Sequence, residues 1–446
     1  MKRILVANRG EIAIRIINAC KTCDVETVAV YSQPDEASSH SWIADRAVCI
    51  GAAAASASYL CEDRLIHVAL ETGCDGLHPG YGFLSERHEF ARKCVAAGIT
   101  FVGPSPDHIL LMGDKAEGRR TVQKLGVPVV PGSEDAFSVA EEAYKAAESI
   151  DYPLLLKARA GGGGKGMRIV EGPDQFNRLF AQAHSEAEAA FGNGELYIER
   201  YFKNIRHIEV QVFGDEHGNA CHLGERDCTL QRRHQKLLEE SPSPAIDQST
   251  REQICTAAVA ITQGIAYIGA GTVEFIYDID SGNFFFIEMN TRIQVEHAVT
   301  ECVTGADLIV EQINVAAGKP LSFIDAPVKC QGHAIEFRIN AEDPSNNFLP
   351  SPGVLNLWKP PTGTGIRFDS HAYQGYTVPP FYDSLLGKLI VHGRNRDEAL
   401  AIAATALDSF KVQGVATTIP FHRSVIDHPD FIANRVHTRW VETVLN

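Results

Sequence analysis

Strand-like and helix-like segments alternate along the first hundred residues. Residues 4–7, 27–31 and 100–102 are short apolar or β-branched runs, whereas residues 12–19 and 65–70 repeat apolar side chains at helical spacing. Strands that alternate with helices favour a parallel sheet covered on both faces. The turn after the first run contains one glycine, so the G-x-G-x-x-G pattern of dinucleotide-binding domains is absent.

The length of 446 residues predicts two or three domains. One boundary is expected near residues 113 and 114, and residues 127–200 have the pattern of a compact strand–helix unit with a glycine-rich turn. The stretch after about residue 327 contains short strands, turns and a final helix around residues 396–408. We therefore expect three domains, at residues 1–113, 114–326 and 327–446.

The charge balance argues against a nucleic-acid-binding protein. The chain has 41 Lys and Arg against 56 Asp and Glu, whereas sequence-independent nucleic-acid binding needs a basic surface. No apolar run approaches the roughly 18 residues that span a bilayer, and the first residues lack the apolar region of a secretory signal. The 11 scattered cysteines indicate free thiols in a reducing, cytoplasmic compartment. Cys20 and Cys23 form a CxxC without a second pair, which favours a packed helix face over zinc.

Residues 157–167 read KARAGGGGKGM, a glycine-rich turn that follows an apolar strand. Successive glycines leave backbone N–H groups unobstructed, and such a loop can fold over phosphate oxygens. Lys157 could reach the phosphate as a point charge. The loop is not a P-loop, because Gly166 rather than Ser or Thr follows Lys165. A flexible surface loop is the alternative, although four glycines would cost much conformational entropy there.

Basic side chains gather in residues 222–240, HLGERDCTLQRRHQKLLEE, of an otherwise acidic chain. If this segment is an alternating strand, Arg232, His234 and Lys236 share one face and could bind an anion. The neighbouring Glu and Asp residues leave ion-paired structural arginines or a solvated charged face as alternatives.

Two hydrophobic strands, TVEFIY and FFFIEMN, each contain one carboxylate, Glu274 and Glu288. A buried carboxylate needs a partner. Together with Asn290, the two form an oxygen-rich set of the kind that Mg²⁺ prefers beside substrate phosphates. Structural ion pairs are the alternative, but the glycine-rich loop favours a metal–nucleotide site.

Arg292, Gln294 and Glu296 follow directly, and in a strand they would share one face. A cation, an amide and a carboxylate beside a metal–phosphate site suit a small oxyanion substrate, which one group binds and another deprotonates. Arg338, in the run EFRINAED, is a second such cation. The loop GLHPGYGFLSE at residues 76–86 is, by itself, compatible with simple turn chemistry.

Taken together, these motifs resemble biotin carboxylase, the ATP-grasp component of biotin-dependent carboxylases. The similar segments, from residue 1 to about residue 440, are ANRGEIA, HPGYGFLSE, MGDK, GGGGKGM, ERDCTLQRRHQK, FIEMNTRIQVEH, RINAEDP and GYTVPPFYDS. The resemblance implies an α/β fold, α+β overall. Its parts would be an N-terminal Rossmann-like parallel-sheet domain, an ATP-grasp core with a mobile lid at about residues 130–203, and a C-terminal mixed domain.

The same resemblance implies a reaction. ATP phosphorylates bicarbonate to carboxyphosphate, which breaks down to CO2 and phosphate, and CO2 is added to a ureido nitrogen of biotin. The implied cofactors are ATP and Mg²⁺, with Mn²⁺ as an alternative, and biotin is a carried substrate. The implied partners are a biotin carboxyl carrier protein, a carboxyltransferase and a second copy of the chain, without nucleic acid or membrane. Acetyl-CoA carboxylase, and hence fatty acid biosynthesis, is the expected setting, with other acyl-CoA, pyruvate and urea carboxylases as alternatives.

The resemblance also implies roles for individual residues. Nucleotide binding is implied for Lys115, Lys157, Gly162, Gly163, Gly164, Gly166, Glu199, His207, Gln231 and His234. Metal binding is implied for Glu274, Glu288 and Asn290. Bicarbonate or biotin contacts are implied for Lys236, Arg292, Gln294, Val295 through its backbone, Arg338 and Tyr81. Glu296 is the implied general base, and the catalytic cations are Lys236, Arg292 and Arg338, the last of which steadies the biotin enolate.

Some positions depart from the family pattern. Arg159 and Ala160 stand where Ser-Gly is usual, so lid closure or nucleotide affinity is expected to differ. Asn18 and Thr22 replace a charged pair that some members use in dimer contacts. No Met-Lys-Met segment is present, so biotin is expected on another polypeptide. A different ATP-grasp ligase and a non-catalytic ATP-binding scaffold are the remaining alternatives, and the complete catalytic set disfavours both.

Overall fold

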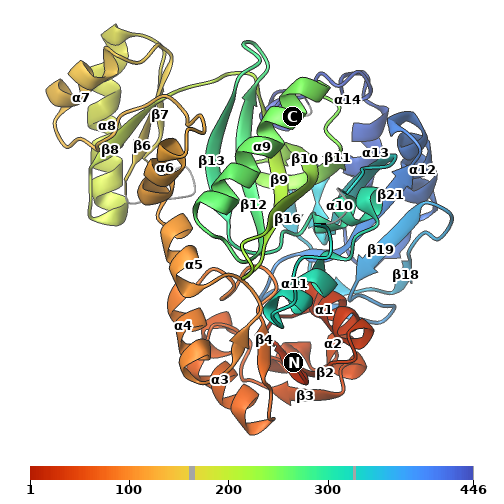
Figure 1. The fold of residues 1–446 in the computed structure, drawn as a ribbon. Coiled ribbons are helices and arrows are strands. Elements are labelled where there is room, and N and C mark those ends of the chain that lie inside the picture. Colours follow the sequence, from red (N-terminus) through yellow and green to blue (C-terminus); the bar gives the residue numbers. More distant parts are fainter. Residues whose placement is uncertain (160–165, 325–327, 445–446) are drawn as a thin grey trace. The chain divides into compact units, whose positions relative to one another are not determined.

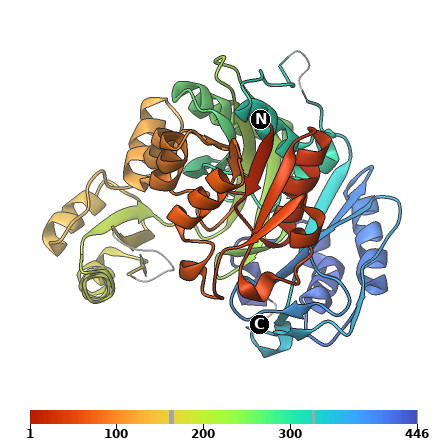
Figure 2. The ribbon, with the colours of Figure 1, turned by 90° about the horizontal axis from the view of Figure 1, so that it is seen from below.

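The computed structural model describes residues 1–159, 166–324 and 328–444, and Figures 1 and 2 show its ribbon from two sides. The chain divides into two compact units. The larger unit comprises Met1–Val127, Arg206–Phe275 and Glu288–Asn446, and the smaller unit comprises Pro128–Ile205 and Ile276–Ile287.

A parallel sheet opens the larger unit. Its strands are β1 Arg3–Val6, β2 Glu26–Tyr31, β3 Arg46–Cys49, β4 Gly76–His78 and β5 Thr100–Phe101, in the order β3-β2-β1-β4-β5. The helices of this region are α1 Gly10–Thr22, α2 His40–Ile43, α3 Glu62–Glu71, α4 His88–Ala96, α5 Pro106–Gly113 and α6 Lys115–Lys124.

Both faces of the parallel sheet are covered. Ile4 of β1 shares an apolar cluster with Ile12 and Ile16 of α1, whereas Leu5 shares another cluster with Phe90 of α4. Successive side chains of a strand point to opposite faces, so these two clusters lie on opposite sides of β1. Figure 2 shows helices on both sides of the red strands. The two-sided burial is the one that the alternating sequence predicts.

An eight-stranded sheet positions most of the residues to which the sequence assigns chemistry (Figure 1). In spatial order its strands are β13 Phe284–Asn290, β12 Gly269–Asp278, β9 Ile205–Gly214, β10 Ala220–Arg232, β11 Gln235–Ser241, β14 His333–Asn340, β21 Leu385–Gly393 and β19 Ile366–Ser370. The pairs from β9 to β19 are antiparallel. The helices between these strands are α9 Gln248–Gly264, α10 His297–Thr304 and α11 Leu308–Ala316. Because α10 packs against β10, β11 and β14, its N-terminus lies beside the middle of the sheet.

The C-terminal region covers β14 and β21 with helices. They are α12 Arg396–Ser409, α13 Ile419–Asp427, α14 Pro429–Ile432 and α15 Trp440–Val444. Ala399, Ala403 and Leu407 recur at helical spacing on α12 and are buried in the core of this region. Short strand pairs complete it: β15 Glu342–Asp343 with β16 Leu349–Pro350, β17 Gly353–Val354 with β20 Thr377–Val378, and β18 Leu357–Lys359 with β22 Lys411–Gln413.

The smaller unit has its own antiparallel sheet and core. β6 Leu154–Ala158 lies between β7 Arg168–Val170 and β8 Leu196–Arg200, and the helices are α7 Ala140–Ala147 and α8 Pro173–Phe191. Leu154 and Leu156 of β6 share a core with Phe176 and Phe180 of α8. Gly192 ends α8 in the left-handed conformation, with φ 69°, which a glycine adopts without steric cost.

The predicted fold class is confirmed, because a parallel N-terminal sheet is combined with antiparallel sheets in a mixed α/β chain. The domain boundaries stay a prediction, and β11 and β14 pair in one sheet although the expected boundary at residue 327 lies between them. All 11 cysteines are free thiols, and Cys20, on α1, is buried in the core. Among the helices of the described residues, none has the length and apolar character that crossing a bilayer requires.

Three local expectations are wrong. Residues 232–236 do not form an alternating strand, because Arg233 and His234 have φ values of 48° and 65° and turn the chain between β10 and β11. Residues 291–296 follow β13 as turns, so their side chains do not share a strand face. The sequence predicts a final helix at residues 396–408, which is α12, but α13, α14 and α15 follow it. They have nine residues or fewer, too short for hydrophobic periodicity to reveal.

Candidate active site

Lys236, on β11, lies at the centre of the candidate active site. Its Nζ is 2.5 Å from Oε2 of Glu209 on β9 and 2.6 Å from Oε1 of Glu296, the residue directly before α10. Oε1 of Glu274, on β12, is 3.2 Å from the same nitrogen. The order of the strands and the start of α10 together bring three carboxylates to one ammonium group.

The charges of this cluster decide how its members are protonated. Burial alone would lower the pKa of Lys236, but its three carboxylates raise that pKa well above its ordinary value. Burial would likewise raise the pKa of Glu296, yet the surrounding cations, first Lys236 and then Arg338, hold it well below the ordinary value. Lys236 is therefore an ammonium and Glu296 a carboxylate near neutral pH, and a positioned carboxylate can accept a proton from a bound substrate.

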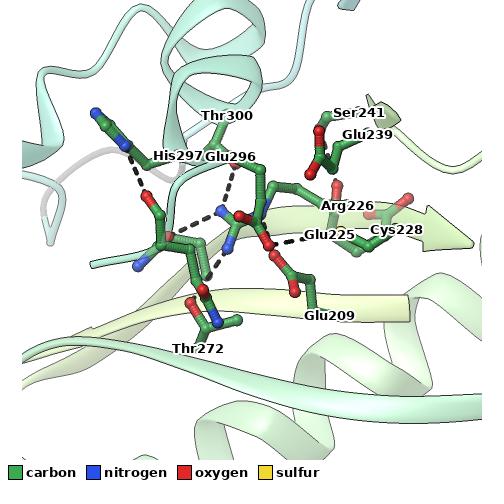
Figure 3. Close-up of polar contacts among 12 residues, drawn as sticks. Glu209, Glu225, Arg226, Cys228, Glu239, Ser241, Thr272, Glu296, His297 and Thr300 are labelled. Atoms are coloured by element: carbon green, nitrogen blue, oxygen red, sulfur yellow. Dashed lines mark hydrogen bonds and ion pairs between the residues drawn. The ribbon is translucent and has the colours of Figure 1, made fainter. Parts of the chain in front are cut away.

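Arg226, on β10 and fully buried, fixes the position of Glu209 (Figure 3). Its Nε donates to Oε1 of Glu209 at 2.5 Å, and its Nη1 and Nη2 donate to the hydroxyls of Thr300 at 3.0 Å and Thr272 at 3.1 Å. Each oxygen of Glu209 thus faces one cation, Arg226 or Lys236. A doubly paired carboxylate is a rigid support, because moving it would leave buried charges without partners.

Three side-chain acceptors hold the guanidinium of Arg292. Its Nε donates to Oε2 of Glu86 at 2.8 Å, its Nη1 to Oε1 of Gln294 at 2.8 Å and its Nη2 to Oδ1 of Asn290 at 3.1 Å. Gln294 in turn donates to Oε1 of Glu274 at 3.1 Å. The turns after β13 therefore bring these side chains together. The sequence predicted that they would lie close, but on one face of an alternating strand.

The three residues that the sequence assigned to a metal are contacted by other side chains of the protein. Nδ2 of Asn290 donates to Oε1 of Glu274 at 2.8 Å, and Nε2 of His207 lies 2.8 Å from Oε2 of the same carboxylate. Glu288, which is more exposed, pairs with Nζ of Lys115 at 2.8 Å. Carboxylate and amide oxygens are the donors that Mg²⁺ prefers, so the chemistry of Glu274, Glu288 and Asn290 fits that ion.

Arg338, on β14, contacts the second oxygen of the implied base. Its Nη2 lies 2.9 Å from Oε2 of Glu296, and its Nε donates to Oε1 of Glu239 at 2.7 Å. Glu296 therefore accepts from Lys236 through one oxygen and from Arg338 through the other. The carboxylate of Glu296 therefore links Lys236, implied in bicarbonate binding, to Arg338, which the resemblance places beside biotin.

Two further residues implied in substrate contacts have partners within the protein. The hydroxyl of Tyr81 donates to Oε1 of Glu11. The carbonyl of Val295 accepts a hydrogen bond from Nζ of Lys388 at 2.7 Å. Contacts of Tyr81 and Val295 with a substrate stay a prediction.

The residues implied in nucleotide binding are divided between the units. The larger unit contains Lys115, His207, Gln231 and His234, and the smaller unit contains Lys157, Gly166 and Glu199. Gln231 is buried opposite Lys236 in the β10–β11 register, whereas His234 is exposed in the turn. Nζ of Lys157 on β6 lies 2.9 Å from Oε2 of Glu199 on β8. Gly162, Gly163 and Gly164 lie outside the described residues.

Sequence reasoning missed three residues of this cluster. Glu209 stands in the apolar strand segment IEVQV, and a lone carboxylate among apolar residues is the signal that pointed to Glu274. Arg226 lies in the basic run, where the sequence left ion-paired structural arginines open. Glu86 ends the HPGYGFLSE segment, which was compatible with simple turn chemistry, and its partner Arg292 is about 200 residues away in the chain.

Known families match the chain over nearly its whole length. The matching family models are described as biotin carboxylase, N-terminal domain (residues 1–109), carbamoyl-phosphate synthase L chain, ATP binding domain (residues 114–324), and biotin carboxylase C-terminal domain (residues 336–443). A relative from Bacillus subtilis, named biotin carboxylase 1, is 52% identical over 443 residues, which cover 99% of this chain and 98% of the relative.

Solved structures agree with the family models. A crystal structure of a Campylobacter jejuni biotin carboxylase–β-γ-ATP complex has a TM-score of 0.93 and 47% identity, and the match covers 99% of this chain and 98% of that one. The biotin carboxylase domain dimer of a 2-oxoglutarate carboxylase from Hydrogenobacter thermophilus, in complex with MgADP, ADP and bicarbonate, has a TM-score of 0.92 and 46% identity, with 99% and 97% covered. The resemblance seen in the motifs is thereby confirmed, and the chain belongs to the biotin carboxylase family of ATP-grasp ligases.

Proposed function

We propose that this chain uses ATP and bicarbonate to carboxylate biotin on a separate carrier protein, the first half-reaction of a biotin-dependent carboxylase. The main support is the position of Glu296 between Lys236 and Arg338. These two contacts link Lys236, which also contacts the candidate metal ligand Glu274, to Arg338, the arginine implied in biotin binding. The two similar structures, which contain β-γ-ATP or MgADP with bicarbonate, support the same ligands here.

In the first step, Lys236 and Arg292 bind bicarbonate and Glu296 removes its proton. Glutamate is a weak base, with a reference pKa of about 4.3, so the transfer is productive only when cations hold the resulting dianion. A bicarbonate oxygen then attacks the γ-phosphorus of ATP, the bond to ADP breaks and carboxyphosphate forms.

Glu274, Glu288 and Asn290 are the residues that would hold Mg²⁺. The ion supplies charge neutralisation to the phosphoryl group during its transfer. Within the protein, Lys115 pairs with Glu288, and Nε2 of His207 lies 2.8 Å from Oε2 of Glu274.

In the second step, carboxyphosphate splits into CO2 and phosphate. The released phosphate takes the proton from the ureido nitrogen of biotin, and that nitrogen attacks CO2. Negative charge develops on the ureido oxygen, and Arg338 stabilises it as an oxyanion donor.

We propose acetyl-CoA as the final acceptor, reached through a partner carboxyltransferase. The Bacillus subtilis relative, 52% identical to this chain, is named biotin carboxylase 1, which supports the same half-reaction here. The Hydrogenobacter structure comes from a 2-oxoglutarate carboxylase, so 2-oxo acids are the competing acceptors to include in an assay. The dimer in that structure supports a homodimer here, and the free cysteines support a cytoplasmic location.

The decisive experiment measures phosphate release from ATP by the purified chain with Mg²⁺. The expected release requires bicarbonate and increases when free biotin is added. Release that is independent of bicarbonate would indicate a different ATP-grasp ligase, and ATP binding without release would indicate a scaffold; either result overturns the proposal. Addition of a biotinylated carrier and a carboxyltransferase, with acetyl-CoA, pyruvate or 2-oxoglutarate, then tests the acceptor.

A further inference from the structure

Two buried carboxyl groups face each other beside Arg338. Glu239 on β11 and Glu336 on β14 are direct partners in the antiparallel register, and both side chains are completely buried. Directly opposed residues share one face of the sheet, with their Cβ atoms roughly 4.5–5.5 Å apart. Two ionised carboxylates at opposed positions on one face of a sheet, away from water, repel each other, and one of them is then held in the neutral form.

The two carboxyl groups differ in their hydrogen bonds. Oε1 of Glu239 lies 2.7 Å from Nε and 2.5 Å from Nη2 of Arg338. Oε2 of Glu239 and both oxygens of Glu336 have no hydrogen-bond partner among the groups that the structure describes. A buried carboxylate without partners is costly, whereas a protonated one has lost its charge and gained an O–H donor.

We propose that Glu239 and Glu336 hold one proton between them, with Glu336 as the neutral acid, and that this pair positions Arg338 for the biotin half-reaction. The positioning of Arg338 for biotin rests on the proposed function, whereas the shared proton is independent of that function. In this arrangement Glu239 carries the single negative charge of the pair and faces Arg338 directly.

The surroundings favour this distribution of charge. The charged groups that interact with the pair are Arg338 on β14, Lys388 on β21, Lys236 on β11 and Glu296 before α10. Beyond Lys388 lie Glu11 on α1 and Asp369 on β19, and the thiol of Cys302 on α10 is a further titratable neighbour of Glu336. Burial and the neighbouring carboxylates raise the pKa of both groups. Arg338 limits the rise at Glu239, whose pKa is about 7, whereas the pKa of Glu336 rises well above its ordinary value. Lys388 opposes that change, but its ammonium is already engaged, at 2.7 Å from the carbonyl of Val295 and 3.5 Å from Glu11.

The proton has a consequence for Arg338. While Glu336 is neutral, the guanidinium is shared between Glu239 and Glu296 only. Ionisation of Glu336 would add a further negative charge beside the guanidinium and weaken the positive potential that it offers to a ureido oxygen. Carboxylation of biotin should therefore decline at alkaline pH more steeply than the cleavage of ATP that needs only bicarbonate.

Infrared spectroscopy of the full chain detects the proton directly. A carboxylic acid has a C=O stretching band that is separate from the carboxylate bands and shifts in D2O. The wild-type protein should show such a band at about pH 7.5, far above the reference pKa of glutamate near 4.3, and E336Q should lose intensity there. The matched control is Glu311→Gln, which removes a buried carboxylate whose two oxygens both accept hydrogen bonds from Ser322 and which should leave the band unchanged.

Two infrared results would overturn the shared proton. The first is a wild-type band that disappears at the pH of an ordinary carboxyl group, and the second is a band of equal intensity in E336Q. The first result needs no variant, so the proposal can be overturned even where E336Q does not fold.

The kinetic experiment tests the positioning role. Glutamine resembles the neutral acid but cannot ionise, so the alkaline decline of kcat/KM for free biotin should move up by roughly one pH unit or more in E336Q. Bicarbonate-dependent ATP cleavage without biotin should keep its wild-type pH profile. Superimposable biotin profiles would show that the pair is only structural. Failure of the proposed function would look different, because bicarbonate-dependent cleavage would be missing from the wild-type protein while the infrared band remained.

Discussion

Nζ of Lys236 lies 2.6 Å from one oxygen of Glu296, and Nη2 of Arg338 lies 2.9 Å from the other. The carboxylate itself is completely buried. Two cations keep it ionised and also make it a weaker base. It can act as a base only if the same cations stabilise the deprotonated substrate, so proton transfer and substrate binding have to be coupled.

Replacement of the implied base tests that coupling. Glu296→Gln keeps the shape of the side chain but removes the proton acceptor, and we expect bicarbonate-dependent ATP cleavage to fall by roughly 10²–10⁴-fold. ATP binding, measured by calorimetry with Mg²⁺, should persist. Wild-type turnover in this variant would rule out Glu296 as the base.

Arg338→Gln should separate the two half-reactions. The guanidinium donates to the ureido oxygen only in the biotin step, so biotin-dependent turnover should fall by roughly 10²–10³-fold. Biotin-independent ATP cleavage should fall by less than about tenfold, because it loses only a neighbour of the base. Both rates are measured by phosphate release on the same preparation. Equal losses would place Arg338 in the ATP half-reaction instead.

The sequence predicted the fold best where the information is local. Alternation of apolar runs with helical periodicity predicted the parallel sheet, because each strand and the helix that follows it are adjacent in the chain. The pairing of β11 with β14 joins Glu239 to Glu336 across almost one hundred residues. Neither segment contains a local signal for its partner, since register is set by packing of the whole sheet.

The candidate site shows the same division. Glu274 could be predicted because a lone carboxylate in an apolar strand needs a partner, and the same rule would have found Glu209. The convergence of Arg292 and Gln294 was expected for the wrong reason, since turns rather than a strand bring them together. Glu86 could not be found from its own segment, because its role depends on a distant arginine.

Glu86→Gln tests whether the orientation of Arg292 matters. The substitution removes the charge of an acceptor that lies 2.8 Å from Nε of Arg292. Loss of a charge-assisted hydrogen bond costs about 1.5–3 kcal/mol, so KM for bicarbonate should rise roughly tenfold or more, with a smaller change in kcat. The matched control is Glu89→Gln on α4, an exposed carboxylate that pairs with Arg92 and should leave KM unchanged. Equal KM values in both variants would contradict the role of Glu86.

The departure from the family pattern before the glycine-rich loop can be tested by restoring Ser-Gly. Nη1 of Arg159 lies 2.9 Å from Oε2 of Glu195, and both side chains are partly exposed. Such a pair contributes about 0–1 kcal/mol to stability, so Arg159→Ser with Ala160→Gly should hardly change the free energy of unfolding. The apparent KM for ATP should fall by up to about fivefold, because at most that interaction energy is removed from the loop. Lys203→Ser, which breaks a similar exposed pair in the same unit, is the control. An unaltered KM for ATP would show that the loop tolerates the departure.

Glu240 should make stability depend on pH in the acid range. Its carboxylate lies 2.7 Å from Nε of Arg396 and 2.9 Å from Nε2 of His333. Burial would raise the pKa of Glu240, but Arg396 and His333 lower it to about 2. The unfolded value is about 4.3, so the unfolded chain binds more protons between these two values. The contribution, about 3 kcal/mol at most, is therefore fully present above about pH 4.5 and is lost as the pH falls toward 2.

Urea denaturation of the wild-type protein and Glu240→Gln between about pH 3 and pH 7 measures this contribution. The variant should be less stable near neutral pH, because the partly buried guanidinium of Arg396 loses its carboxylate partner. Its free energy of unfolding should also fall less steeply than that of the wild-type protein below about pH 4.5, because glutamine binds no proton. Parallel curves for the two proteins would mean that the carboxyl group of Glu240 has the same pKa in the folded and unfolded chain, and the ion pair with Arg396 would then contribute nothing to acid stability.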